Sequence, residues 1–317
     1  MEIKLYEDWM QPQVLKLFSD QYGRTEQELF DIHTKFYDHS FQKNKCIRIV
    51  ALDGDIITGF QSLFYWPYIK NDKIYRTFQS GNSIVHPSYR GKGIFQQLLN
   101  YLDNHNEDLK IDFLLGFPVE ASFGSFIRNN WTNPFNLSWY LKLINPLAFL
   151  FSKNRLIKNF EKEPKLINPF SSDNIFRLNF DKDFQSWRSG FVDEKKYFYY
   201  NYTEGSLSIT FGLKFNQRSK YFNELIIGEI RTNSYDSVFL KKAFKNLIKK
   251  SRLTLCVTAL TIALNDTNNS SILNAIKSSS FIKTKKQIYF ITKSYNNNSE
   301  INEPSNWELF RSDIDSW

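Results

Sequence analysis

The first half of the chain alternates between strand-like and helix-like patterns of apolar residues. Residues 2–6 alternate apolar and polar side chains as a half-buried strand does, and residues 12–22 place their apolar side chains on one helical face. A second helix follows. Apolar runs at 46–52 and 56–65 flank Asp53-Gly54-Asp55, and because Asp-Gly readily adopts the positive φ of a tight turn, this stretch predicts a β-hairpin.

The same alternation continues toward the middle of the chain. We predict a strand at 75–85, a helix at 94–105, a short apolar strand at 111–117 and then a helix that reaches Trp131. A further apolar run, 141–151, is interrupted by charged and polar residues and is shorter than the roughly 18 residues of a membrane-spanning helix. For this run we expect a buried or interdomain helix, and peripheral contact with a membrane surface is the alternative.

The second half repeats this order without repeating the sequence. We predict strands at 207–215, 224–230, 253–260 and 287–292, and helices at 237–250 and 270–279. Polar stretches with proline at 133–134 and 164–174 separate the halves. The pattern therefore predicts an α/β protein of two domains, residues 1–145 and 146–317.

Composition narrows the class of protein. The 317 residues include 17% aromatic side chains, more than a core alone needs, so we expect some of them to line a ligand cleft. A net charge of +8 favours anionic partners such as phosphorylated metabolites, nucleic acid or a membrane surface, although a lysine-rich solvated surface gives the same balance. Cys46 and Cys256 form no CxxC motif, the four histidines have no metal spacing and the N-terminus does not read as a signal peptide, so we expect a cytoplasmic protein without a metal.

The segment 83–95 carries the strongest chemical signal. It places Gly91 and Gly93 in a basic turn between a predicted strand and a predicted helix, with Arg90 and Lys92 beside them. The first amides of a helix have no intrahelical partner, and the helix dipole adds positive potential there. Glycines let a phosphate approach closely, so the segment predicts a pyrophosphate-binding turn.

This segment resembles motif A of the GNAT superfamily of acyl-CoA N-acyltransferases, in which Arg/Gln-x-x-Gly-x-Gly/Ala follows a Val-x-Pro strand end. Val85, Pro87, Arg90 and Gly93 match, and Phe95 stands at the third small position. The resemblance implies a GNAT fold: a mixed, mostly antiparallel sheet with two splayed strands and flanking helices, followed by a GNAT-like second domain. It also implies how CoA is held. The backbone of Ile84 and Val85 would pair with the pantetheine arm, and the CoA pyrophosphate would be bound by the backbone amides of Arg90, Gly91, Lys92, Gly93, Ile94 and Phe95.

The strand at 111–117 and the helix after it resemble the second GNAT motif, where the thioester lies between splayed strands. Many members have a tyrosine early on that helix to protonate the thiolate, but Phe123 stands there here. Since an unperturbed thiol has a pKa of about 8.5, a thiolate can leave without a dedicated acid. Glu120 and His86 are candidate bases, and Asn82 is a candidate for orienting the amine. Each has a structural alternative: Glu120 as a carboxylate that stabilises a helix N-terminus, His86 as a solvated turn residue, and Asn82 as an amide bonded to backbone.

The second half has no Arg-Gly-x-Gly turn, so we expect it to recognise the acceptor rather than CoA. Its aromatic groups, and an ending that combines Trp307 to Phe310 with Asp313 and Asp315, resemble a two-domain GNAT subgroup associated with bacterial surface polysaccharides. That subgroup acylates amino sugars carried on a nucleotide, such as a dTDP-3-amino-3,6-dideoxyhexose. Stacking and diphosphate contacts are expected from Trp187, Arg188, Tyr197 and Tyr199, for which core packing is the alternative.

The resemblance thus implies transfer of an acetyl or 3-hydroxybutyryl group from acyl-CoA to a sugar amine, by direct attack in a ternary complex, for O-antigen or capsule synthesis. A peptide, lipid or aminoacyl acceptor is the alternative within enzymes. A basic, aromatic-rich module that binds nucleic acid without catalysis is the alternative outside them, and the even spread of its basic residues argues against it. No Gly-x-Ser-x-Gly or Walker motif supports a hydrolase or a kinase.

Overall fold

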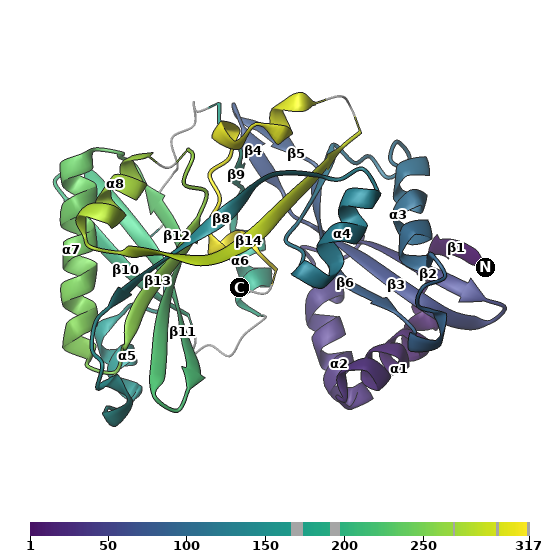
Figure 1. Ribbon diagram of the computed structural model, residues 1–317, viewed down its shortest axis with the longest axis horizontal. Helices are drawn as coiled ribbons and strands as arrows, with labels where there is room; N and C mark the ends of the chain where they lie inside the picture. Colours follow the sequence, from purple (N-terminus) through teal and green to yellow (C-terminus); the bar gives the residue numbers. More distant parts are fainter. Residues whose placement is uncertain (166–173, 191–196, 269, 296–297, 316–317) are drawn as a thin grey trace.

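The structure is a computed structural model, and it describes residues 1–165, 174–190, 197–268, 270–295 and 298–315. Within these residues one 11-stranded mixed sheet runs through the molecule, with helices on its faces (Figure 1). In spatial order its strands are β1 (Glu2–Leu5), β2 (Ile47–Asp53), β3 (Ile56–Tyr65), β6 (Thr77–Val85), β7 (Phe113–Gly116), β14 (Ile282–Ser294), β8 (Thr132–Leu143), β13 (Ala259–Leu264), β12 (Phe222–Thr232), β11 (Leu207–Ser219) and β10 (Tyr197–Glu204). A small second sheet contains β5 (Lys73–Tyr75), β4 (Tyr68–Lys70) and β9 (Arg177–Leu178).

The helices divide between two halves of similar order, which we call the N-terminal and C-terminal units. The N-terminal unit carries α1 (Gln11–Tyr22), α2 (Glu26–His33), α3 (Ile94–Asn104) and α4 (Glu120–Arg128). The C-terminal unit carries α5 (Asn154–Asn159), α7 (Ser237–Thr254) and α8 (Ser270–Ser278), and α6 (Lys182–Ser189) lies between the units. Each unit has one parallel strand pair, β6 with β7 and β12 with β13, and each pair is connected through a helix.

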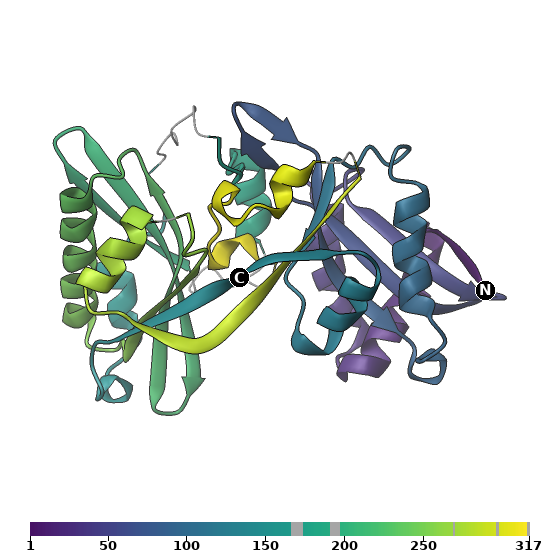
Figure 2. The same ribbon diagram turned by 45° about the horizontal axis from the view of Figure 1, so that its top comes forward.

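The two units exchange strands at the centre of the sheet. β8 follows the N-terminal unit in the chain but pairs with β13 of the C-terminal unit, while the end of β14 returns to pair with β7. β8 and β14 also pair with each other and form the long twisted ribbon that joins the units in Figure 2. The division of the chain into two domains after residue 145 remains a proposal, because hydrogen bonding runs without a break from β7 through β14 and β8 to β13.

The two faces of the N-terminal sheet are covered by different helices. On one face Ile94 and Leu98 of α3 pack against Gly59 and Ala51, and a Cβ atom at Gly59 would lie 2.8 Å from the Ile94 side chain. On the other face Phe18 of α1 meets Phe60 edge-on at 5.5 Å. Because neighbouring strand residues point to opposite faces, α3 and α1 lie on opposite sides of the sheet.

Most predicted elements are present, and the exceptions have local reasons. The helix expected at 141–151 is wrong, because β8 extends to Leu143 and only a 3₁₀ turn, Ala148–Leu150, follows. The strand expected at 253–260 begins only at Ala259, because α7 extends to Thr254 and closes with Leu255 in the left-handed region at φ +61°. The 133–134 break falls inside β8, and most of the 164–174 stretch lies outside the described residues.

Candidate active site

The turn between β6 and α3 has the geometry of an anion site. Gly91 and Gly93 have φ values of +77° and +74°, which other residues adopt only with strain, and a Cβ atom at either would meet nothing within 4 Å. Gly93 is the N-cap of α3 and gives it no side-chain hydrogen bond. The first amides of α3 therefore face an open space with the positive end of the helix dipole behind them.

The predicted CoA-binding residues lie together around this turn. Arg90 and Lys92 are exposed there, and Arg90 Nε donates to the Val85 carbonyl oxygen over 3.3 Å. Ile84 is buried in β6, and Phe95 packs edge-on against Phe126 of α4 at 5.3 Å. This packing gives the third small position of the motif a structural role, because the phenylalanine ring fills the space between α3 and α4.

The corresponding helix of the C-terminal unit is closed to an anion. α7 follows the parallel strand β12 as α3 follows β6, but its N-cap Asp236 accepts a hydrogen bond of 2.7 Å from the Phe239 amide. A carboxylate therefore already occupies the helix N-terminus. This supports the expectation that only the N-terminal unit carries a pyrophosphate turn.

The parallel strands β6 and β7 separate beside the turn. Their last paired residues are Ser80 and Gly116, after which β6 continues toward Val85 paired with β3 but no longer with β7. Asn82 lies in this part of β6, at an irregularity in its pairing with β3, with φ +46°, and its Nδ2 donates to the Tyr37 hydroxyl over 2.9 Å. A positive φ within a strand re-aims the side chain, so Asn82 points toward α1 and α2 rather than toward α3.

A cavity of about 520 Å³ opens next to Asn82 on the α1 and α2 face. Its walls are mostly aromatic and aliphatic, with cations from Arg24 and Lys35 and polar groups from His33 and Asn82. The other lining residues are Leu15, Phe18, Tyr22, Leu29, Ile32, Phe36 and Tyr37. Its volume is that of a pocket for a small molecule.

His33 is an unusual polar group in the cavity wall. Its side chain is buried, and the amide nitrogen of Gln11 lies 3.3 Å from Nδ1. If Gln11 donates, Nδ1 accepts and the proton of the neutral ring is on Nε2, which has no partner among the described residues. Burial and repulsion from Arg48 lower the pKa of His33 to about 4, so the ring is neutral near pH 7.

The other candidate catalytic residues are more exposed. Glu120 is the first residue of α4 and lies in solvent at the positive end of the helix dipole. His86 lies before the 3₁₀ turn at 87–89 and accepts from the Ser88 amide through Nδ1. Phe123 stacks on Tyr289 of β14 with ring centroids 4.3 Å apart, so a phenol from the exchanged strand lies beside the position where a tyrosine was expected.

A carboxylate from the end of the chain also reaches β6. A Cβ atom added to Gly81 would lie 2.9 Å from Asp315 Oδ2, which places this carboxylate one residue from Asn82. The Gln79 side chain holds the backbone on both sides of residue 314. Its Nε2 donates to the Asp313 carbonyl oxygen over 2.7 Å, and its Oε1 accepts from the Asp315 amide over 2.7 Å.

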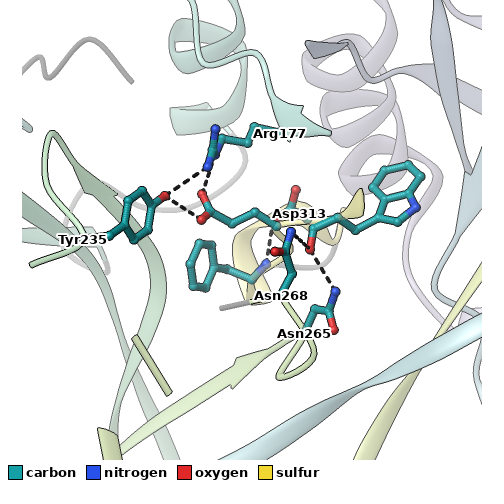
Figure 3. A network of polar contacts seen from close by, with 8 residues as sticks. Arg177, Tyr235, Asn265, Asn268 and Asp313 are labelled. Atoms are coloured by element: carbon teal, nitrogen blue, oxygen red, sulfur yellow. Dashed lines mark hydrogen bonds and ion pairs between the residues drawn. The ribbon is translucent and has the colours of Figure 1, made fainter. Parts of the chain in front are cut away.

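Residues 307–315, which we call the C-terminal segment, are anchored at several points (Figure 3). Glu308 accepts hydrogen bonds from Arg177 over 2.8 Å and from Tyr235 over 2.6 Å. Asn265 and Asn268 donate to the Trp307 carbonyl oxygen. Farther along, the Asp313 carboxylate accepts from the Phe310 amide and the Tyr68 hydroxyl, and burial raises its pKa to about 7.

Two of the four predicted acceptor contacts, Trp187 and Arg188, are buried. Trp187 is 1% exposed and its indole donates to the Phe36 carbonyl oxygen over 3.0 Å. Arg188 is 6% exposed and donates to the Asp315 carbonyl oxygen over 2.7 Å. Tyr197 and Tyr199 of β10 are half-buried, and burial raises the pKa of both phenols. Packing and anchoring thus account for the contacts of the first two.

Sequence reasoning missed the cavity residues of α1 and α2. Their apolar positions follow the ordinary helical pattern, and nothing in that pattern distinguishes a cavity wall from a core. The sequence indicates Asp315 only as part of the chain ending, since its approach to Gly81 depends on the anchored C-terminal segment.

Among the described residues no group of three or more His, Cys, Asp or Glu side chains could hold a metal ion.

Comparison with known proteins agrees with this geometry. A family model described as an acetyltransferase (GNAT) domain matches residues 2–126, which contain the turn, both splayed strands and the whole cavity. No curated protein matches the chain.

Solved structures share the fold at low sequence identity. A GCN5-related N-acetyltransferase from Anabaena variabilis is 11% identical with a TM-score of 0.64, over 94% of this chain and 74% of the other. One from Kribbella flavida is 8% identical with a TM-score of 0.58, over 95% and 73%. N-myristoyltransferase from Saccharomyces cerevisiae, solved with bound myristoyl-CoA, is 11% identical with a TM-score of 0.52, over 99% and 84%. The fold is therefore the mixed α/β fold of these transferases over both units.

Proposed function

We propose that this protein, an acyl-CoA-dependent N-acyltransferase with a GNAT acetyltransferase domain at residues 2–126, acylates the amine of a nucleotide-linked deoxyamino sugar. The observation that carries the proposal is the placement of two sites on opposite faces of one strand gap. The uncapped turn at Gly91 and Gly93 leads to the gap from the α3 side, and the cavity begins at Asn82 on the other side.

The cavity is suited to a compact, anionic acceptor. Aromatic walls can stack on a nucleobase or a sugar face, and Arg24 and Lys35 can neutralise a diphosphate. A dTDP-linked 3-amino-3,6-dideoxyhexose has these parts, and its acylation with an acetyl or 3-hydroxybutyryl group would serve O-antigen or capsule synthesis in the cytoplasm. Tyr197 and Tyr199 of the C-terminal unit, with Trp187 and Arg188 of α6, remain proposed acceptor contacts. Arg188 would act through the backbone at Asp315 and Trp187 through the Phe36 backbone in the cavity wall.

The chain's own residues would move the protons. An amino sugar arrives largely as an ammonium ion, so a carboxylate must take one proton before nitrogen can attack the thioester carbon. As the carbon–nitrogen bond forms and the carbon–sulfur bond breaks, the second proton leaves nitrogen for the departing sulfur. Asp315, at Gly81, and Glu120, at the start of α4, are the two proposed proton acceptors, and Asn82 is proposed to orient the amine.

The test follows thiol release from acetyl-CoA and from 3-hydroxybutyryl-CoA with a panel of dTDP- and UDP-linked amino sugars. Release with one sugar identifies donor and acceptor together, whereas CoA binding without release on any sugar would redirect the proposal to peptide or lipid amines. Asp315→Asn and Glu120→Gln then separate the two carboxylates. Loss of the proton acceptor should lower kcat/KM by about 10²–10⁴ near pH 7 and by less at a pH where the amine is already neutral.

A further inference from the structure

One end of the C-terminal unit exposes an unusual number of large apolar side chains. Six of them are between 38% and 65% exposed: Leu143, Leu147, Phe149, Leu150, Tyr221 and Leu253. They come from the end of β8 and the turn after it, the tip of the β11–β12 hairpin and the end of α7, which lie together at the lower left in Figures 1 and 2. Phe149 and Tyr221 meet edge-on at 5.2 Å, which joins two of these segments. We call this set the apolar patch.

The backbone under the apolar patch is held in place. Asn145 Nδ2 donates to the Leu255 carbonyl oxygen over 2.6 Å, which ties the turn to the end of α7. Its side-chain oxygen accepts from the Leu147 amide over 3.1 Å. Ala148 is fully buried, so the turn directs this small residue inward and its leucines outward. The exposed side chains are therefore presented by an ordered turn.

Cations surround the apolar patch. Lys153, Lys220, Lys249 and Arg252 are exposed beside it, and residues 237–254 of α7 contain no Asp or Glu. Burial, together with repulsion from nearby Arg252, lowers the pKa of Lys142. Like charges crowded around apolar side chains are unfavourable in water and are relieved by an anionic partner. We call these five side chains the cationic rim.

We propose that the apolar patch and the cationic rim bind the surface of an anionic lipid bilayer. The leucines would enter the boundary between headgroups and acyl chains, and the lysines and arginine would lie at the lipid phosphates. A second copy of the chain is disfavoured as the occupant, because a two-fold interface would bring each cationic rim against the other. No helix in the described part of the chain is long and apolar enough to cross a membrane, so the contact would be peripheral.

The test is co-sedimentation of the full chain with vesicles of phosphatidylcholine alone and of phosphatidylcholine with about one third phosphatidylglycerol. Wild type should bind the anionic vesicles, and the binding should weaken strongly in high salt. The double variant Leu147→Ser/Leu150→Ser should lower the partition coefficient by about tenfold or more for each leucine. Arg252→Glu should lower it by at least the fivefold expected for one cation.

Ile56→Ser is the matched control, because Ile56 is 59% exposed in the hairpin of the N-terminal unit and away from the apolar patch. It should bind the anionic vesicles as wild type does. Failure of wild type to bind them, or equal losses in Ile56→Ser and in the leucine variant, would overturn the proposal. Sedimentation velocity gives the alternative occupant: a dimer that dissociates in the leucine variant would assign the apolar patch to a second copy. None of these residues lies in the proposed acyl-transfer site, so acylation of a soluble nucleotide-linked amino sugar should be unchanged.

Discussion

Replacing Gly93 by tryptophan separates the strain of a left-handed residue from the loss of a binding site. Gly93 is exposed and has φ +74° with no atom within 4 Å of an added Cβ, so a side chain can leave the backbone here without a clash at Cβ, and the expected cost is backbone strain. For a non-glycine residue in this region that strain is about 1–2 kcal/mol. The indole would cover the first amides of α3, and losing two amide–phosphate hydrogen bonds at about 1.5–3 kcal/mol each predicts a Kd for CoA about 10²- to 10⁴-fold higher.

Gly205 provides the matched control. It lies in the β10–β11 turn with φ +61°, also with nothing within 4 Å, so Gly205→Trp carries the same strain far from the proposed pyrophosphate-binding turn. Urea unfolding should show similar destabilisation in both variants, and calorimetric titration with CoA should show weaker binding only in Gly93→Trp. Wild-type CoA affinity in Gly93→Trp, or equal weakening in both variants, would refute the assignment of the pyrophosphate site.

Three further variants test separate parts of the structure. Gln79→Leu should lower the free energy of unfolding by about 2–4 kcal/mol, because it leaves the Asp313 carbonyl and the Asp315 amide without their 2.7 Å partners; destabilisation under 1 kcal/mol in urea would contradict the anchoring. The pKa of His33 is lowered from 6.5 to about 4, so its stabilising contribution is complete above pH 6.5 and is lost as pH falls toward 4. That contribution is about 3 kcal/mol, so the difference in the free energy of unfolding between wild type and His33→Gln should change by about 3 kcal/mol between pH 6.5 and pH 4. The comparison with wild type cancels the opposite pH dependence of Asp313, whose raised pKa favours the folded state as pH falls. A difference that does not change with pH would count against a neutral buried ring. Cys46→Ser/Cys256→Ala should retain activity, since Cys256 is buried and burial raises the pKa of the Cys46 thiol, and an acyl group found on either cysteine by mass spectrometry would replace direct attack with a covalent intermediate.

The sequence predicted the strand, the turn at residues 90–93 and the helix after it, and there is a physical reason for this. The turn at residues 90–93 is defined by glycines whose backbone geometry depends on near neighbours, and the strand and helix around it follow from apolar periodicity. The fold class could be predicted for the same reason, because the alternation of strands and helices is written along the chain.

Long-range placement could not be predicted in this way. Trp187 and Arg188 have the residue types of a ligand site, but whether an indole packs inside or faces a cleft depends on the strand arrangement around it. Asp315 approaches Gly81 only because Gln79 and Arg188 hold the intervening backbone. The run at 141–151 was misread because its apolar residues end a strand and then cover a surface, two roles that share one composition.

The exchange of β8 and β14 also affects how the chain is made. Ser294 pairs with Phe113 and Ile291 with Gly116, so the sheet beside the splayed strands is completed by residues synthesised long after the rest of the N-terminal unit. During translation β7 would have an open edge until β14 leaves the ribosome, and unpaired edges are sites of aggregation. A fragment ending after residue 145 would keep that open edge permanently, together with a β8 strand that has lost both of its partners. Expression of isolated halves is therefore expected to give insoluble material, and co-expression of both halves is the way to recover the folded protein from fragments.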